Sequence, residues 1–433
     1  MSTLSPAARL RTLLSSARLV RVFGMGVTMQ ALLSGANLIV GLILIRRASD
    51  LQYSYYILAT GALLLATSLQ ASFMQPYLVT QITRAELPAR RELVGSVLRA
   101  SRRWALWLCA VALVVTAGAG LLRYLSTEQA LLISVSLVAA VLALGREFFR
   151  MTLFAYRRPL EVLRADLAYV GLLIGGAFAA TLGAQPAMLA MGALGLAALV
   201  AAAMLRAGLW RYEPWDKAAG GTDVLERMAV WGGWSVTGAG IHWLLIQGYS
   251  YLVAGVLDVG HVAALAATRL VLMPVFVLSG GVSMLLFPLT SRWVHESGVG
   301  VGTRRLVLLV AALAALALCY MGVMWLLRDW IFSVILKKHF EQRDLLLLLW
   351  SAVFLVTLCR DQLAMLPAAR GKFRNLTLLT GVSAAVWLLA SYLAVRTFGA
   401  PGAVGGILTG ELVNLIGIVV MIALETRHAA ASG

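Results

Sequence analysis

Twelve long apolar stretches constrain the fold of this chain more than any other feature of its sequence. Each is bounded by charged residues or by segments that contain glycine or proline. A helix that crosses a bilayer needs about 20 mostly apolar residues, and the stretches are close to that length. The predicted spans are 22–45, 54–82, 104–122, 128–155, 165–182, 187–205, 230–256, 260–290, 306–327, 345–369, 375–395 and 402–424. The sequence therefore predicts an all-α integral membrane protein with twelve transmembrane helices.

The composition agrees with a membrane protein and argues against several other classes. Hydrophobic residues make up 61% of the 433 residues and charged residues only 13%, whereas soluble domains carry about 25% charged residues. The net charge of +17 is explained by membrane topology, so no nucleic-acid partner is expected. The cysteines lie in apolar runs, and the patterns CxxC, HExxH and GxxxxGK[ST] do not occur. We expect no disulfide, no metal site, no bound cofactor and no enzymatic activity.

The distribution of basic residues predicts the orientation of the chain. With the N-terminus in the cytosol, 25 of the 36 Lys and Arg residues fall in cytosolic segments and 8 fall outside. Because cytosolic loops carry the excess of Lys and Arg, both termini are predicted to be cytosolic. Segment 328–344 is predicted to be an amphipathic outer loop. Segment 1–21 lacks an apolar core and a cleavage site, so it is predicted to be a cytosolic tail rather than a signal peptide. The alternative is a short basic helix that lies on the inner face of the membrane.

The two halves of the chain match each other. Three pairs of matching features follow in the same order: Asp50 and Thr60 with Asp258 and Thr268, Arg146-Glu147 with Arg360-Asp361, and TLGAQPA (181–187) with TFGAPGA (397–403). Each half holds six spans, an even number, so both halves cross the membrane in the same direction. A pseudo-two-fold axis along the membrane normal follows, with a cavity between two bundles and alternating access by rocking.

This duplication sets the predicted domains. They are a cytosolic tail over 1–21, a six-helix bundle over 22–210, a cytosolic linker over 211–229, a second six-helix bundle over 230–424 and a cytosolic tail over 425–433.

Three arginines, Arg146, Arg269 and Arg360, lie near the middle of predicted spans. An arginine at that depth costs roughly 2.5–3.5 kcal/mol on insertion scales, so each needs a compensating environment. Arg150 and Arg157 share the helix face of Arg146 and extend it into a basic stripe. If the two dipeptides form ion pairs, each arginine should pair with another helix rather than with its neighbour, because adjacent residues on a helix point about 100° apart. Two interpretations stay open: ion pairs that join helices, or groups that line the cavity.

Other polar side chains lie on faces that are expected to line the same cavity. Ser34 and Asn37 share one face of the first span, and His242 lies on the seventh span at the corresponding place in the other half. A hydrogen bond between helices is the alternative for His242. The candidates for coupling to an ion are Glu147, Asp258, Asp361 and Glu411. The sequence does not choose between a proton gradient and a sodium gradient.

Within the predicted spans, bases outnumber unpaired acids, so the cavity is expected to be basic and to bind an anion. Arginine binds phosphate oxygens through two parallel hydrogen bonds, which suits a pyrophosphate carried by a lipid. The candidate substrate-binding residues are Arg146, Arg150, Arg269, Arg360, Ser34, Asn37 and His242.

Several segments resemble one family of transporters. MQALLSGANLIVGLILIRRASDLQYSYYILATGALLLATSLQASFMQPYLV resembles the first two helices of polysaccharide flippases in the multidrug/oligosaccharidyl-lipid/polysaccharide exporter superfamily. GREFFRMTLFAYRRP and RDQLAMLPAARGKFRN resemble the ends of their fourth and tenth helices, and FGAPGAVGGILTGELVNLIG resembles their last helix. The chain departs from the family at Gln52-Tyr53-Ser54-Tyr55, where a Tyr/Phe-Gly pair is usual.

This resemblance implies a flippase of the O-antigen or exopolysaccharide type. Such proteins move undecaprenyl-pyrophosphate-linked sugar repeat units from the inner to the outer leaflet of a bacterial inner membrane. The implied partners are the lipid-linked oligosaccharide, membrane lipids and polysaccharide polymerase machinery. A lipid-II-type flippase is disfavoured, because those proteins resemble fourteen-span chains. The alternatives are a secondary exporter of drugs or small organic anions and a non-transporting membrane assembly factor.

The orientation can be tested by labelling. In a chain whose native cysteines are replaced, a cysteine near Lys338 should react with an impermeant thiol reagent in intact spheroplasts, because segment 328–344 is predicted to lie outside. A cysteine at Ser2 should react only after the membrane is broken. Reversed labelling would contradict the predicted orientation.

Overall fold

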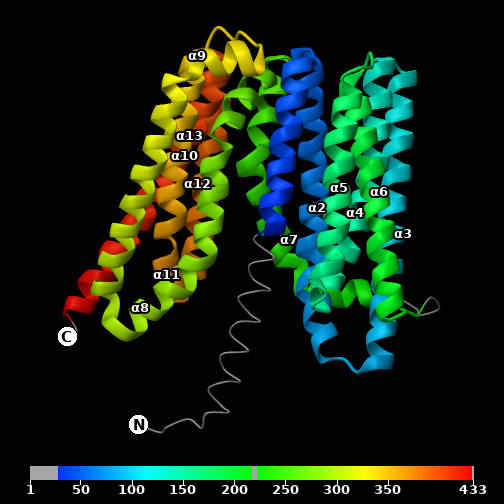
Figure 1. Cartoon of the computed structure of the whole chain (residues 1–433). Helices are drawn as coiled ribbons and strands as arrows, with labels where there is room; N and C mark the ends of the chain where they lie inside the picture. The colour runs from blue at the N-terminus through cyan, green and yellow to red at the C-terminus, as the bar shows by residue number, and fades with distance from the viewer. Residues whose placement is uncertain (1–27, 217–221, 432–433) are drawn as a thin grey trace. The chain divides into compact units, whose positions relative to one another are not determined.

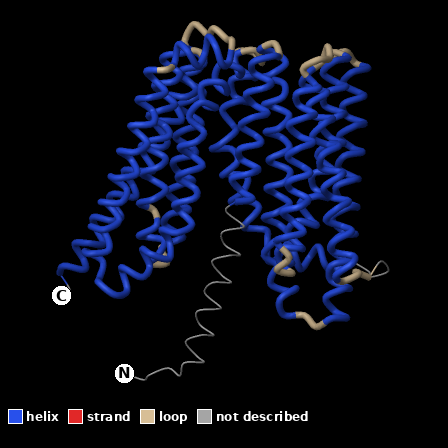
Figure 2. Tube along the Cα trace, in the orientation of Figure 1, coloured by secondary structure: helices blue, strands red, loops and turns tan. Residues whose placement is uncertain are grey.

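The structure, a computed structural model, describes residues 28–216 and 222–431. Almost all of these residues are helical, and Figure 2 shows only helices and short loops in the part of the chain that it describes. The helices are Thr28–Arg47, α2 (Asp50–Arg84), α3 (Leu87–Leu121), α4 (Thr127–Ala155), α5 (Pro159–Ala180), α6 (Pro186–Tyr212), α7 (Thr222–Val256), α8 (His261–Leu326), α9 (Arg328–Trp330), the π-helix η1 (Ile331–Leu336), α10 (Arg343–Leu363), α11 (Met365–Ala369), α12 (Phe373–Phe398) and α13 (Ala400–Ala431).

Ten helical segments of the described chain are long and apolar enough to cross a membrane. The long helix α8 contains two of them, because its path is broken at Gly298, where φ is 80° and ψ is 168°. A φ in this range favours glycine, which has no Cβ to clash with the backbone. The break separates the predicted spans 260–290 and 306–327. Segment 328–344, predicted as an outer loop, forms α9, η1 and a turn.

The described residues form two compact units. The first comprises the residues up to Val40 and Ala62–Ala239, and the second comprises Gly41–Gly61 and the residues from Gly240 onward. The predicted bundles 22–210 and 230–424 differ from this division at two places and stay a prediction. Hydrogen bonds explain one difference: Tyr251 donates to the Leu58 carbonyl at 2.7 Å and Trp243 to the Gly61 carbonyl at 2.8 Å. Both bonds join the start of α2 to the second unit.

The predicted tails and linker are covered only in part. Residues 1–21 lie outside the described residues, as do 217–221 of the linker. Helix α13 continues to Ala431 and so passes residue 424, where the second bundle was predicted to end. Glu213, at the start of the linker, accepts hydrogen bonds from Arg90 and Tyr156 at 2.9 and 2.8 Å. Burial alone would raise the pKa of Glu213, but these two donors hold it below its ordinary value.

In the first unit, α6 packs closely against α4 and α5, as Figure 1 shows. Helix α6 is rich in alanine and glycine, and such small residues let helix backbones approach. A Cβ added at Gly195 would lie 3.1 Å from the Ala139 Cβ of α4. There is no room at this contact for a larger side chain from α6.

In the second unit, α12 and α13 are held together by a stripe of glycines at every fourth position. Added Cβ atoms at Gly402, Gly406 and Gly410 would lie 2.1 to 2.5 Å from atoms of Ala394, Ser391 and Trp387 on α12. Because this face of α13 lies against α12, neighbouring positions on α13 point elsewhere. The stripe therefore fixes the rotation of α13, which carries Glu411.

A pair of adjacent glycines tests the importance of this contact. Gly406→Ala should destabilise the protein, by about 1–3 kcal/mol as for other overpacked sites, because its Cβ would lie 2.2 Å from the Ser391 Oγ. Gly405→Ala is the matched control, since an added Cβ there has no atom within 4 Å. It should leave stability unchanged or slightly raised. Thermal unfolding in detergent measures both, and equal melting of the two variants would contradict the close packing.

Candidate functional site

A cavity of about 320 Å³ lies inside the second unit. Five helices line it, each with residues at helical spacing, so that one stripe of every helix faces the cavity. Its polar and aromatic lining comprises His242 of α7, Arg269 and Phe276 of α8, Trp350, Phe354, Thr357, Arg360 and Asp361 of α10, Thr380 of α12, and Glu411 and Asn414 of α13. Ligand pockets are typically about 300–1,000 Å³ and mostly apolar with a few polar groups, and this cavity fits that description.

At one end of the cavity Arg360 contacts two carboxylates. Its Nη2 lies 2.6 Å from Asp361 Oδ1 and its Nη1 lies 2.6 Å from Glu411 Oε2 on α13. The contact with Glu411 is a close ion pair rather than a well-directed hydrogen bond. The prediction that Arg360 pairs only with another helix is therefore wrong in part. The arginine side chain is long enough to fold back onto the adjacent carboxylate while it also reaches α13.

Arg269 has a different environment. Its Nη1 donates to Gln247 Oε1 and to the Tyr249 hydroxyl, both at 3.1 Å, and no carboxylate of the described residues pairs with it. Its guanidinium carbon lies 5.5 Å from the centre of the Tyr249 ring and 5.6 Å from that of Trp350. Such cation–π contacts and neutral hydrogen bonds orient a guanidinium without cancelling its charge. Arg269 thus brings an uncompensated positive charge to the cavity.

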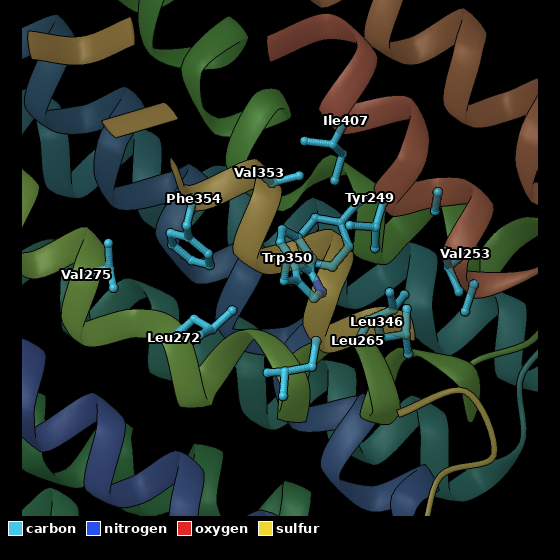
Figure 3. Close-up of a cluster of buried hydrophobic side chains, with 14 of the residues drawn as sticks. Tyr249, Val253, Leu265, Leu272, Val275, Leu346, Trp350, Val353, Phe354 and Ile407 are labelled. Atoms are coloured by element: carbon cyan, nitrogen blue, oxygen red, sulfur yellow. The ribbon is translucent and has the colours of Figure 1, made fainter. Parts of the chain in front are cut away.

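An aromatic cluster supports this end of the cavity. Trp350 packs edge-to-face on Tyr249, with ring centres 5.1 Å apart, and lies 6.1 Å from Phe354. Figure 3 shows these three rings among the aliphatic side chains of α8 and α10, including Leu272 and Val275. The cluster is buried, so it holds the cavity wall in place.

In the first unit the arginines of the fourth span are neutralised. Arg146 Nη2 lies 2.5 Å from Asp166 Oδ1, and Arg150 Nε lies 3.1 Å from Asp166 Oδ2. Arg150 also contacts Glu147 at 3.4 Å, and the ring of Tyr169 lies 3.9 Å from the guanidinium carbon of Arg146. Asp166 is completely buried. Glu147 and Arg150 line a second cavity of about 440 Å³ in this unit.

Asp166, the buried partner of Arg146 and Arg150, is the acid that the sequence analysis missed. It lies within the predicted span 165–182, so a count of acids inside the spans would have found it. Among the residues that line the two cavities, the three arginines Arg150, Arg269 and Arg360 are matched in number by three carboxylates, those of Glu147, Asp361 and Glu411. The predicted excess of bases over acids is therefore wrong for these two cavities.

The other predicted site residues divide into those that line the cavity of the second unit and those that lie elsewhere. His242, Asp361 and Glu411 line the cavity of the second unit together with Arg269 and Arg360. Ser34 is half-buried and Asn37 exposed, and neither is among the residues that line the described cavities.

Asp258 lies away from the cavity, in the exposed turn before α8. It accepts a hydrogen bond from the Gly260 N–H at 2.6 Å and contacts His261 Nδ1 at 2.5 Å. Across residues 28–216 and 222–431, no group of three or more His, Cys, Asp or Glu residues could hold a metal ion.

Solved structures identify the class of fold. An inward-facing multidrug resistance MATE family transporter of the MOP superfamily matches over 92% of this chain and 94% of its own, with a TM-score of 0.71 and 15% identity. The fold of this chain is that of MOP superfamily transporters, which confirms the predicted all-α integral membrane fold.

Two further solved structures are similar to this chain. The lipid II flippase MurJ in an inward closed conformation matches over 93% of this chain and 86% of its own, with a TM-score of 0.70 and 12% identity. A MOP superfamily transporter from Pyrococcus furiosus, whose binding pocket of reverse polarity suggests a different function, matches over 95% of both chains with a TM-score of 0.59 and 15% identity. No protein-family model and no curated protein match the chain. The neighbours are transporters rather than enzymes, and this chain is a multi-span membrane protein like them.

The ion pairs and the free arginine should respond differently to substitution. Arg360→Gln leaves Asp361 and Glu411 without their partner, so it should lower stability by about 3–5 kcal/mol. Arg146→Gln should cost less, because Arg150 still contacts the buried carboxylate of Asp166. Arg269→Gln loses only neutral partners and should melt close to the wild type.

Thermal unfolding in detergent distinguishes these variants. Arg360→Gln combined with Glu411→Gln should regain part of the loss, because the second change removes one orphaned charge. Equal melting of Arg360→Gln and Arg269→Gln would show that the ion pairs do not hold the helices together.

Proposed function

We propose that this chain is a flippase that moves undecaprenyl-pyrophosphate-linked oligosaccharide repeat units from the inner to the outer leaflet of a bacterial inner membrane. The observation that carries this proposal is the free guanidinium of Arg269 in a cavity inside a membrane fold. An uncompensated cation at this depth is costly unless an anionic ligand meets it. The O-antigen or exopolysaccharide pathway is the proposed setting, with the polymerase machinery as a proposed partner.

The fold supports a lipid-linked substrate. One neighbour is a lipid II flippase, and it matches this chain over nearly the same length as the drug exporter does. The cavity joins an aromatic wall to a set of polar groups, an arrangement that suits sugar rings and hydroxyls better than a purely apolar compound. We place both termini in the cytosol, so that substrate enters from the leaflet where the basic loops lie.

Ion coupling is proposed for the carboxylates that line the cavities. Asp361 and Glu411 share a single guanidinium in the second unit, and Glu147 lines the cavity of the first. A carboxylate in such a place can take up a proton or hold a sodium ion. Either gradient can then drive alternating access.

A second candidate function is the export of cationic drugs. The carboxylates of Asp361 and Glu411 in the cavity and the MATE family neighbours favour it. Arg269 disfavours it, because a positive charge in the same cavity repels a cationic compound.

A reconstituted assay tests the proposal. Proteoliposomes with the wild-type chain should move a fluorescent undecaprenyl-pyrophosphate-linked oligosaccharide between leaflets. Thr380→Trp fills the cavity and should reduce the rate at least tenfold, whereas Val382→Trp, two residues further along α12 on an exposed position, should retain it. Melting temperatures show whether both variants fold. Gradient-driven efflux of a cationic dye without any lipid flipping would favour the exporter instead.

A further inference from the structure

The two ends of the second unit's cavity carry opposite charge. Arg269 contributes one positive charge at the end formed by Trp350. At the other end, one guanidinium faces two carboxylates, which leaves a surplus of one negative charge when both are ionised. Trp350 and Asp361 are eleven residues apart on α10, so the two ends are about 16 Å apart along the helix.

This distribution limits the charge of a ligand. A single anionic group can reach the guanidinium of Arg269 while it stays away from Asp361 and Glu411. A diphosphate carries more than one negative charge, and within the same cavity it would have one free cation and a surplus of acid. Like charges close together are disfavoured, so the acidic end selects against a multiply charged group.

The lining near Arg269 also defines the shape of the ligand. Phe276, Trp350 and Phe354 present aromatic surface there, and the hydroxyl of Thr357 comes one turn further along α10. Gln247 and Tyr249 hold the guanidinium through neutral hydrogen bonds, so its planar fork is oriented before a ligand arrives. A planar fork matches a carboxylate, which accepts two parallel hydrogen bonds.

We infer that the Arg269 end of this cavity binds one carboxylate carried by the glycan, and that the oligosaccharides handled by this chain therefore contain an acidic sugar. The inference rests on the proposed function and narrows its substrate class. On this inference the pyrophosphate of the lipid carrier is not the group that Arg269 binds. Arg269 acts as the residue that distinguishes acidic from neutral glycans.

The test compares two lipid-linked glycans that differ in one group. Both carry the same undecaprenyl pyrophosphate and the same sugars, but one ends in glucuronate and the other in glucose. Wild-type proteoliposomes should flip the glucuronate form about ten times faster, as expected for a hydrogen bond to a charged group. Arg269→Gln should bring the ratio of the two rates to about one, and Arg269→Lys should retain part of the preference, since it keeps the charge but not the fork.

Two controls separate a charge effect from damage. Arg396→Gln removes an arginine that is exposed at the end of α12 and bonded to Tyr392, so the preference should stay at the wild-type ratio. Binding of free glucuronate, glucose and inorganic pyrophosphate to the detergent-solubilised chain gives a readout that does not depend on flipping. Glucuronate should bind tightest, and Arg269→Gln should abolish that advantage.

The outcomes distinguish failure of this inference from failure of the proposed function on which it rests. If neither lipid-linked glycan is flipped, the proposed function itself fails. If both are flipped at the same rate and Arg269→Gln leaves the ratio at one, the flippase stands and the acidic-sugar site is overturned. Tighter binding of pyrophosphate than of glucuronate, lost in Arg269→Gln, would assign the cavity to the diphosphate and also overturn the inference.

Discussion

The structure depends on how buried guanidinium groups are compensated in a medium that solvates charge poorly. Arg146 is held by Asp166 and Arg360 by Asp361 and Glu411, so each of these arginines joins the helix that carries it to another helix. Removing one partner from such a pair is far more costly than the pair is stabilising, which makes the arrangement specific. Arg269 is the exception within the second unit. Its neutral partners orient the charge but leave it available to a ligand.

The two halves compensate their buried arginines with acids from different helices. In the first unit the acid comes from α5, and α12, its counterpart in the second unit, has no acidic residue. In the second unit the acid comes from α13, whereas α6, its counterpart in the first, has none and packs on α4 through Gly195. Glu411 of α13 lines the cavity of the second unit, whereas Gly195 of α6 lies directly against α4. Between the predicted repeats, Arg146-Glu147 matches Arg360-Asp361, whereas the acids Asp166 and Glu411 have no acidic match in the other half.

The sequence was enough to predict the membrane class, the helices and the arginines that need compensation. The length of an apolar run, and a charge within it, can both be read directly along the chain. The sequence could not identify the partners. Asp166 is 20 residues from Arg146 and Glu411 is 51 residues from Arg360, so only the packing of α4 on α5 and of α10 on α13 brings them together. Asp258 matched Asp50 by position, and the structure places both at the start of a helix, Asp50 as the first residue of α2 and Asp258 in the exposed turn before α8. The neutral surroundings of Arg269 depend on rotamers of Gln247 and Tyr249 that no sequence pattern specifies.

The glycine stripe of α13 has a mechanical consequence. With backbones this close at Gly402, Gly406 and Gly410, α12 and α13 resist sliding or separation and move as one stiff rod. Any widening of the cavity that moves α10 away from this rod must pull Arg360 from Glu411, since one residue is on each side. The ion pair therefore restrains the opening of the cavity, in addition to compensating the buried charge of Arg360. Protonation of Glu411, or its binding to a cation, would break this ion pair and leave the packing of α12 on α13 unchanged.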